Sequence, residues 1–286
     1  MRGTVHVARR SRAAARRAQS AALSSSAASI GDASDAWHDP EFARTWDASD
    51  VLVTNPNRTE HLALLSELLT ARIAASGGSG SVVELGCGSG HIAELVVERV
   101  VGVETYAGFD FSQAMLELAK ARLAPHIVSG QCAFHRADFR DLAVHPAAVA
   151  LASSPPSAVL AVQTLHEVPS AIKRDVYAVA KQLLEPSRGC FYVLDRFGPH
   201  GYSPQGRATL AGLEPEFRAM WTRSTRAAAR EDPALRHKTW EEYLAYLDKD
   251  DHIEDVEETM AGLRDAGFAS VHCVHKAFNR ALICAA

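Results

Sequence analysis

Hydrophobic and polar positions follow two different periods along the chain. Near the N-terminus, Leu62, Leu65, Leu69 and Ile73 recur at helical spacing, and the glycine-rich stretch 76–80 ends that pattern. From residue 81 onward, short apolar runs of strand length alternate with segments of helical period. Repeated strand–helix–strand units of this kind form parallel sheets with helices on both faces. The pattern therefore predicts an α/β fold with a doubly wound, mostly parallel sheet.

The boundaries of the individual elements follow from the same pattern. Strands are expected at 81–85, 106–110, 131–137, 158–168 and 189–195, and helices at 91–100, 170–184 and 255–266, with a further helix capped by Ser112. Residues 143–157 are rich in Ala, Pro and Ser and are expected to form a loop. Residues 199–252 break the alternation, whereas 269–275 and 278–284 are close enough to form a closing hairpin.

A glycine-rich turn follows the first expected strand in the stretch VVELGCGSG, residues 82–90. A P-loop would need Gly-Lys-Ser/Thr, and a dinucleotide fold would need its third glycine at His91, one residue after Gly90. Glu84 lies two residues before Gly86, where a carboxylate opposes a pyrophosphate but suits an ammonium group. S-adenosylmethionine carries such an ammonium, and its carboxylate can bind the helix N-terminus at 88–90.

Two acidic residues further along the chain suit the other parts of this ligand. Asp110 ends the second expected strand, 24 residues after Gly86, where an acid can accept hydrogen bonds from both ribose hydroxyls. Asp138 follows the third strand and can accept from the adenine amine, while Phe139 offers the base an apolar face. Ligands of doubly wound sheets bind outside the carboxyl ends of the strands, which is where all of these residues are expected.

Taken together, these stretches resemble the class I S-adenosylmethionine-dependent methyltransferases. The resemblance rests on 82–90 and on YAGFDFSQAMLELAKARL (106–123), RADFRDL (136–142), VLAVQTLHEVP (159–169), KQLLEPSRGCFYVLD (181–195) and LRDAGFASVHC (263–273). It implies a Rossmann-like methyltransferase fold, a seven-stranded sheet with its last strand antiparallel. The family's Pro-Gly-Gly before strand five is replaced by Pro-Ser-Arg-Gly at 186–189. The cofactor site that the resemblance implies comprises Glu84, Gly86, Gly88, Gly90, Asp110, Phe111, Met115, Asp138, Phe139 and Gln163.

Composition and missing motifs favour a small-molecule methyl acceptor. Outside residues 1–31 the chain holds 24 of its 30 basic residues and all 34 acidic ones, a formal charge of −10, which disfavours nucleic acid. The Asn/Asp-Pro-Pro-Tyr signature of nucleic-acid amino-methyltransferases and the Pro-Cys pair of pyrimidine methylation are both absent. A tRNA or protein methyltransferase and a non-catalytic cofactor-binding subunit remain the alternatives. No metal, membrane segment or particular oligomeric state is indicated.

Two segments are expected to cover the site as lids, the N-terminal helical segment 36–80 and the insertion 199–252 of the methyltransferase domain 81–286. These lids hold five large aromatic residues, which form either a substrate pocket or ordinary packing: Trp37, Trp46, Tyr202, Trp221 and Trp240.

The segment after strand four supplies a candidate general base, His166. An imidazole can take a proton from a hydroxyl, amine or thiol acceptor near neutral pH, although simple packing beside the cofactor is the alternative interpretation. Glu167 is adjacent, but side chains of neighbouring residues in a strand point to opposite faces. Asp195, at the end of the next strand, is therefore the expected partner of His166.

The N-terminal 35 residues are expected to lie outside the fold. Residues 1–31 contain six arginines and no acid, and they are rich in Ala and Ser, a composition typical of mitochondrial or plastid transit peptides. A disordered tail, with a cytoplasmic protein, is the alternative. The five cysteines lack any Cys-x-x-Cys spacing and indicate reduced thiols in a reducing compartment.

Overall fold

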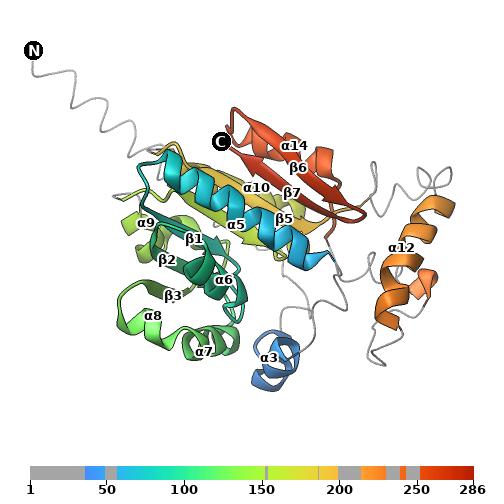
Figure 1. Cartoon of the computed structure of the whole chain (residues 1–286), viewed down its shortest axis with the longest axis horizontal. Helices are drawn as coiled ribbons and strands as arrows, with labels where there is room; N and C mark the ends of the chain where they lie inside the picture. The colour runs from blue at the N-terminus through green and yellow to red at the C-terminus, as the bar shows by residue number, and fades with distance from the viewer. Residues whose placement is uncertain are drawn as a thin grey trace, which may run out of the picture.

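A computed structural model describes residues 36–48, 57–151, 154–185, 187–198, 214–229, 239–242 and 252–286. The predicted transit peptide, residues 1–35, lies outside the described part. A seven-stranded sheet in the order β3-β2-β1-β4-β5-β7-β6 forms the centre of the molecule (Figure 1). The strands are β1 (Gly80–Leu85), β2 (Val103–Asp110), β3 (Cys132–Arg136), β4 (Ala158–Val162), β5 (Cys190–Arg196), β6 (Val271–Ala277) and β7 (Arg280–Ala285).

Strand directions confirm the doubly wound fold. Strands β1 to β5 pair in parallel, whereas β7 is antiparallel to both of its neighbours, β5 and β6. The predicted closing hairpin is therefore present. The order reverses between β1 and β4, so the switch point lies at the carboxyl end of β1, directly beside the glycine turn.

Helices cover both faces of the sheet, which explains why its central strands are apolar at nearly every position. On one face, α5 (Arg58–Ala75) and α6 (His91–Arg99) pack with Val82 and Leu160. On the other face, α10 (Ser170–Leu184) and α14 (Val256–Asp265) pack with Val83 and Phe191. The predicted stripe on α5 is confirmed, because its Leu65, Leu69 and Ile73 are completely buried.

Strand β4 is shorter than the expected span 158–168, because its chain turns after Val162. Gln163 adopts a positive φ of 54°, and residues Leu165–Glu167 form a 3₁₀ helix, η2. The Asp195 carboxylate accepts hydrogen bonds from the backbone N–H groups of Leu165 (2.7 Å) and His166 (3.1 Å). The Asp195 side chain of β5 thus binds two backbone N–H groups. In a longer β4 these groups would have bonded to the backbone of a neighbouring strand.

The expected loop at 143–157 is also wrong in part. Residues Pro146–Leu151 form a short helix, α9, after a 3₁₀ turn at Leu142–Val144. Proline is favourable in the first turn of a helix, where its missing N–H has no partner to lose, and the alanines that follow are strong helix formers.

The remaining helices lie around this core. They are α3 (Pro40–Asp47), α7 (Gln113–Arg122), α8 (Ala124–Val128) and α12 (Glu214–Ala229), the last within the predicted insertion. Ser112 caps α7 as predicted, since its hydroxyl accepts from the Met115 N–H. None of the helices in the described ranges is both long and apolar enough to span a bilayer.

Candidate functional site

The glycine turn after β1 is shaped by close packing at two positions and left open at the third. A Cβ atom on Gly86 would lie 2.0 Å from Thr164 Oγ1, and one on Gly90 would lie 3.1 Å from Ala119. A Cβ on Gly88 would meet nothing within 4 Å. All three glycines have positive φ angles, 76°, 52° and 84°, that disfavour other residues. The turn therefore presents open space at Gly88, immediately before the N-terminus of α6.

Asp110 fastens this turn to the end of β2. Its Oδ2 accepts from the Gly88 N–H at 2.8 Å, and its Oδ1 accepts from the Ser112 N–H at 2.9 Å. Burial raises the pKa of this carboxyl, and the backbone donors counteract that effect. Each carboxylate oxygen can accept a second hydrogen bond, so the residue suits the predicted contact with a ribose diol.

Glu84 is buried beside the turn and shares a hydrogen bond with the Tyr106 hydroxyl. Burial is the main cause that raises its pKa to about 8, and the neighbouring Asp110 adds to the effect, whereas Tyr106 and Arg58 oppose it. A cationic ligand placed here would stabilise the ionised form. The residue therefore suits the ammonium group for which the sequence analysis proposes it.

Arg58, the first residue of α5, is a site residue that sequence reasoning missed. It is 8% exposed, and its Nη1 donates to Gln163 Oε1 at 2.5 Å, just beyond β4. Its charge also acts on Glu84. A guanidinium and a carboxyl group whose charges interact match the carboxylate and ammonium of a free amino acid, which is the methionine part of the predicted cofactor. No local sequence signal marks Arg58, because its partners are far away in the chain.

Other residues predicted for the cofactor have mixed surroundings. Met115, on α7, is buried with 2% of its surface exposed. Phe111 is half-buried, and its ring centroid lies 5.2 Å from that of His38. Asp138 forms an ion pair with Arg140 at 2.6 Å, and Phe139 packs partly buried against the core. The structure thus places Phe111 and Asp138 beyond the carboxyl ends of β2 and β3, with a cation already paired to the acid.

His166 and Asp195 come together at the carboxyl ends of β4 and β5. His166 Nδ1 lies 2.5 Å from Asp195 Oδ1, and both residues are buried. The expectation that Glu167 points away is wrong, since its Oε1 lies 3.2 Å from His166 Nε2. The strand argument failed because these residues lie in η2, where successive side chains are not on opposite faces. Arg196 Nη2 also approaches Nε2, at 2.9 Å.

The charges of this group shift both pKa values strongly. Burial by itself would lower the pKa of His166, but the adjacent Asp195 carboxylate outweighs it and raises this pKa to about 9. Burial would raise the pKa of Asp195, but His166 and the hydrogen bonds to the carboxylate lower it to about 2. At neutral pH the pair is therefore an imidazolium and a carboxylate.

Helix α3 is attached next to the glycine turn. Asp47, its last residue, contacts His91 and Arg122, both at 2.9 Å, and Arg122 Nε donates to the Ser89 carbonyl at 3.0 Å. The Ser112 hydroxyl donates to the Trp37 carbonyl at 2.5 Å. One ionic cluster thus connects α3 to the N-terminus of α6 and to α7.

The lid aromatics form two pairs rather than one pocket. Trp37 and Trp46 have ring centroids 5.7 Å apart, and Trp221 and Trp240 have centroids 5.9 Å apart. Figure 1 shows α3, which carries Trp46, well separated from α12, which carries Trp221. Tyr202 lies outside the described residues. Within the described residues these contacts are packing within each segment.

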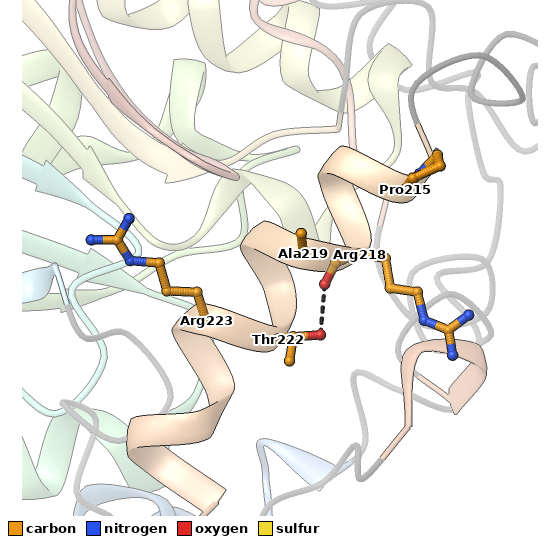
Figure 2. Close-up of a pocket in the computed structure, with 5 residues that line it drawn as sticks. All are labelled: Pro215, Arg218, Ala219, Thr222 and Arg223. Carbon is orange, nitrogen blue, oxygen red and sulfur yellow. Dashed lines mark hydrogen bonds between the residues drawn. The ribbon is translucent and has the colours of Figure 1, made fainter.

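A surface hollow on α12 does not belong to this site. Figure 2 shows it lined by Pro215, Arg218, Ala219, Thr222 and Arg223, with the Thr222 hydroxyl donating to the Arg218 carbonyl at 2.7 Å. Its lining comes from a single helix and includes neither the glycine turn nor the His166–Asp195 pair. No group of three or more metal-ligating side chains is found in the described portion of the chain.

Comparison with known families agrees with this geometry. Residues 82–187 match the family described as "Methyltransferase domain", a span that includes the glycine turn, Asp110, Gln163 and His166. Over these residues the chain is thus similar to methyltransferase domains. The buried Glu84 and Arg58, whose charges interact, suit the methionine part of the predicted cofactor, S-adenosylmethionine. Asp195 lies just beyond the matched span.

Solved structures show the same fold in other proteins. An O-methyltransferase family protein from Burkholderia thailandensis is 16% identical with a TM-score of 0.58, over 88% of this chain and 61% of that one. A possible exported protein from Bordetella parapertussis is 16% identical with a TM-score of 0.52, over 79% of this chain and 66% of that one. This chain thus spans less than two thirds of either protein. A search of curated proteins gives no significant match.

Proposed function

We propose that this methyltransferase domain transfers the methyl group of S-adenosylmethionine to a small-molecule acceptor that loses a proton, such as a hydroxyl, amine or thiol. The observation that carries the proposal is the 2.5 Å contact between His166 and Asp195 beyond β4 and β5. It places an oriented imidazole at the carboxyl edge of the sheet. The glycine turn follows β1, which neighbours β4, and β5 is the next strand after β4 in the sheet. An acceptor that brings a proton needs such a base, whereas an acceptor without one does not.

The cofactor supplies a methyl group already activated by a positive sulfur, so the chain's main task is alignment. Glu84 and Arg58 would hold the amino-acid end of the cofactor, and Asp110 would hold its ribose. The open space at Gly88 leaves room for that molecule at the N-terminus of α6. Binding at both ends fixes the direction in which the methyl group points.

His166 would act through Nε2, because Asp195 occupies Nδ1. Once neutral, Nε2 takes the acceptor's proton, and the Asp195 carboxylate stabilises the imidazolium that forms. The contacts of Arg196 and Glu167 to the same nitrogen would be replaced by the acceptor. Asp195 is thus a positioning residue, whereas His166 contacts the reacting atom.

Small molecules are favoured over macromolecular acceptors by charge. The chain outside residues 1–31 carries a formal charge of −10, which repels a phosphate backbone. A tritiated-methyl transfer screen against a metabolite extract, with total tRNA and a protein extract in parallel, tests the proposal. Label entering only the small-molecule fraction is expected. Label in tRNA or protein contradicts the acceptor class, and tight cofactor binding without transfer to any fraction indicates a non-catalytic subunit.

A further inference from the structure

The predicted insertion leaves the sheet after β5 and returns to it through residues 252–254, the returning segment. The Gly198 N–H donates to the Glu254 carbonyl at 3.0 Å, so the outgoing and returning chains are joined. The His252 N–H donates to the His166 carbonyl at 2.7 Å. The returning segment is therefore bonded directly to η2, the turn that carries the candidate base.

A buried lysine holds the returning segment from the other side. Lys173 lies near the start of α10 and is only 3% exposed, on the same helix face as the buried Val176 and Tyr177. An ammonium group is rarely buried without partners, because its desolvation is costly. The Lys173 Nζ donates to the His252 carbonyl. His252 thus connects two residues, since its carbonyl accepts from Lys173 and its N–H donates to His166.

Carboxylates face this ammonium from three other elements. Burial lowers the pKa of Lys173, the charges of Glu254, Asp195 and Glu258 oppose that effect, and Arg174 adds to it. The three acids belong to the returning segment, to β5 and to α14, whereas the arginine lies on α10 itself. Asp195 also binds the candidate base, so its carboxylate acts on both cations.

We infer that Lys173 is a positioning residue that holds His166 against Asp195 through the returning segment. The inference rests on the proposed function, because it concerns the orientation of the same base. Asp195 accepts from the His166 N–H and His252 donates to the His166 carbonyl, so the backbone of the base is held on both sides. Without the lysine the His252 carbonyl loses its buried donor, which favours displacement of the segment.

NMR titration of His166 in the whole chain separates positioning from a simple effect of charge, with His166→Gln assigning the resonance. Lys173→Met removes both the donor and the charge. If the lysine positions the base, the contact with Asp195 weakens and the pKa of His166 falls from about 9 to below about 8. Loss of a nearby positive charge alone would raise this pKa instead. A higher or unchanged pKa in folded Lys173→Met would therefore overturn the inference.

Two further variants serve as controls for the loss of the lysine. Lys181→Met removes another lysine of α10, whose Nζ lies 5.3 Å from the centroid of the Phe268 ring, and should leave the His166 titration unchanged. Lys173→Arg keeps a charged donor and should retain most of the parent's pKa at His166. An equal fall in Lys173→Met and Lys181→Met would show only a general loosening of α10 and would contradict a specific role of Lys173.

Amide hydrogen exchange in the parent chain tests the same connection without any substitution. The His252 N–H should exchange at least about 100-fold more slowly than an unstructured amide, since it is bonded to the His166 carbonyl. An unprotected His252 amide would overturn the inference even if Lys173→Met failed to fold.

Activity provides a readout that depends on orientation. Lys173→Met should lower kcat about 10-fold at a pH where His166 is neutral in both proteins, with S-adenosylhomocysteine affinity unchanged. An unaltered kcat would overturn the inference and leave the proposed function standing. The expected fall in the His166 pKa, in a chain that transfers no methyl group, would support the connection and count against the proposed function.

Discussion

His166 and Asp195 are 29 residues apart in the chain, yet their side chains meet at 2.5 Å because β4 and β5 are neighbours in the sheet. The contact reverses the effect of burial on the histidine. A buried imidazole normally loses its charge, whereas this one has a pKa of about 9. Any role of His166 as a base therefore depends on pH in a defined direction.

We expect kcat/KM to rise with pH up to about 9, because His166 must be neutral to accept a proton. His166→Gln should lower the rate about 10²- to 10⁴-fold, with cofactor affinity unchanged. Asp195→Asn should move the rising limb to lower pH, since the carboxylate that holds the proton on His166 is gone. A His166→Gln rate within about threefold of the parent at every pH would remove this residue from the mechanism.

Cofactor binding should release a proton near neutral pH. The pKa of Glu84 is about 8 in the unliganded site, and an ammonium group beside it would lower that value, so the carboxyl ionises on binding. Isothermal titration calorimetry of S-adenosylhomocysteine at pH 7, in buffers of different ionisation enthalpy, measures the released proton. In Glu84→Gln the release should disappear, and an undiminished release would assign it to another group.

Gly88→Val should abolish cofactor binding with little loss of stability beyond backbone strain. The new side chain would project into the open space beside the N-terminus of α6, which the cofactor needs. Gly130→Val is the matched control, because Gly130 also has a positive φ, 81°, and open space around it, but lies between α8 and β3. Similar Tm values with S-adenosylhomocysteine binding lost only in Gly88→Val are expected. Retained binding would show that the cofactor does not pass Gly88.

Asp47→Asn should loosen α3 from the glycine turn. The carboxylate joins Arg122 and His91 in a half-buried cluster, so its loss leaves both partners without their shared anion. Faster amide hydrogen exchange in α3 and faster dissociation of S-adenosylhomocysteine are expected. Glu117→Gln, which removes only the exposed pair with Lys120, should change neither. Faster exchange in α3 with unaltered dissociation would show that this helix does not retain the cofactor.

The order of elements and the donor turn could be predicted from sequence because their signals are local. Strand and helix periods can be recognised within short stretches of about 5–15 residues. The residue types at Glu84, at the glycines and at Asp110 match the chemical groups of one ligand, S-adenosylmethionine. The pairing of His166 with Asp195 followed from one further rule, that the ends of neighbouring parallel strands meet at one edge. The predicted length of β4 was wrong, because hydrogen bonds between Asp195 and the backbone after Val162 end the strand. The predicted loop at 143–157 was wrong in part, because Pro146–Leu151 form a helix.

Contacts between distant segments were decided only by the tertiary structure. Arg58 meets Gln163 across 105 residues, and His61 meets His275 across more than 200. Nothing in the local pattern marks these residues, since Arg58 and His61 look like ordinary positions at the start of an amphipathic helix. The sequence by itself determined the fold class and predicted the methyl donor, because both depend on short motifs. The packing of α5 against the sheet decided the surroundings of Arg58 and His61, because burial and pairing exist only once these segments come together.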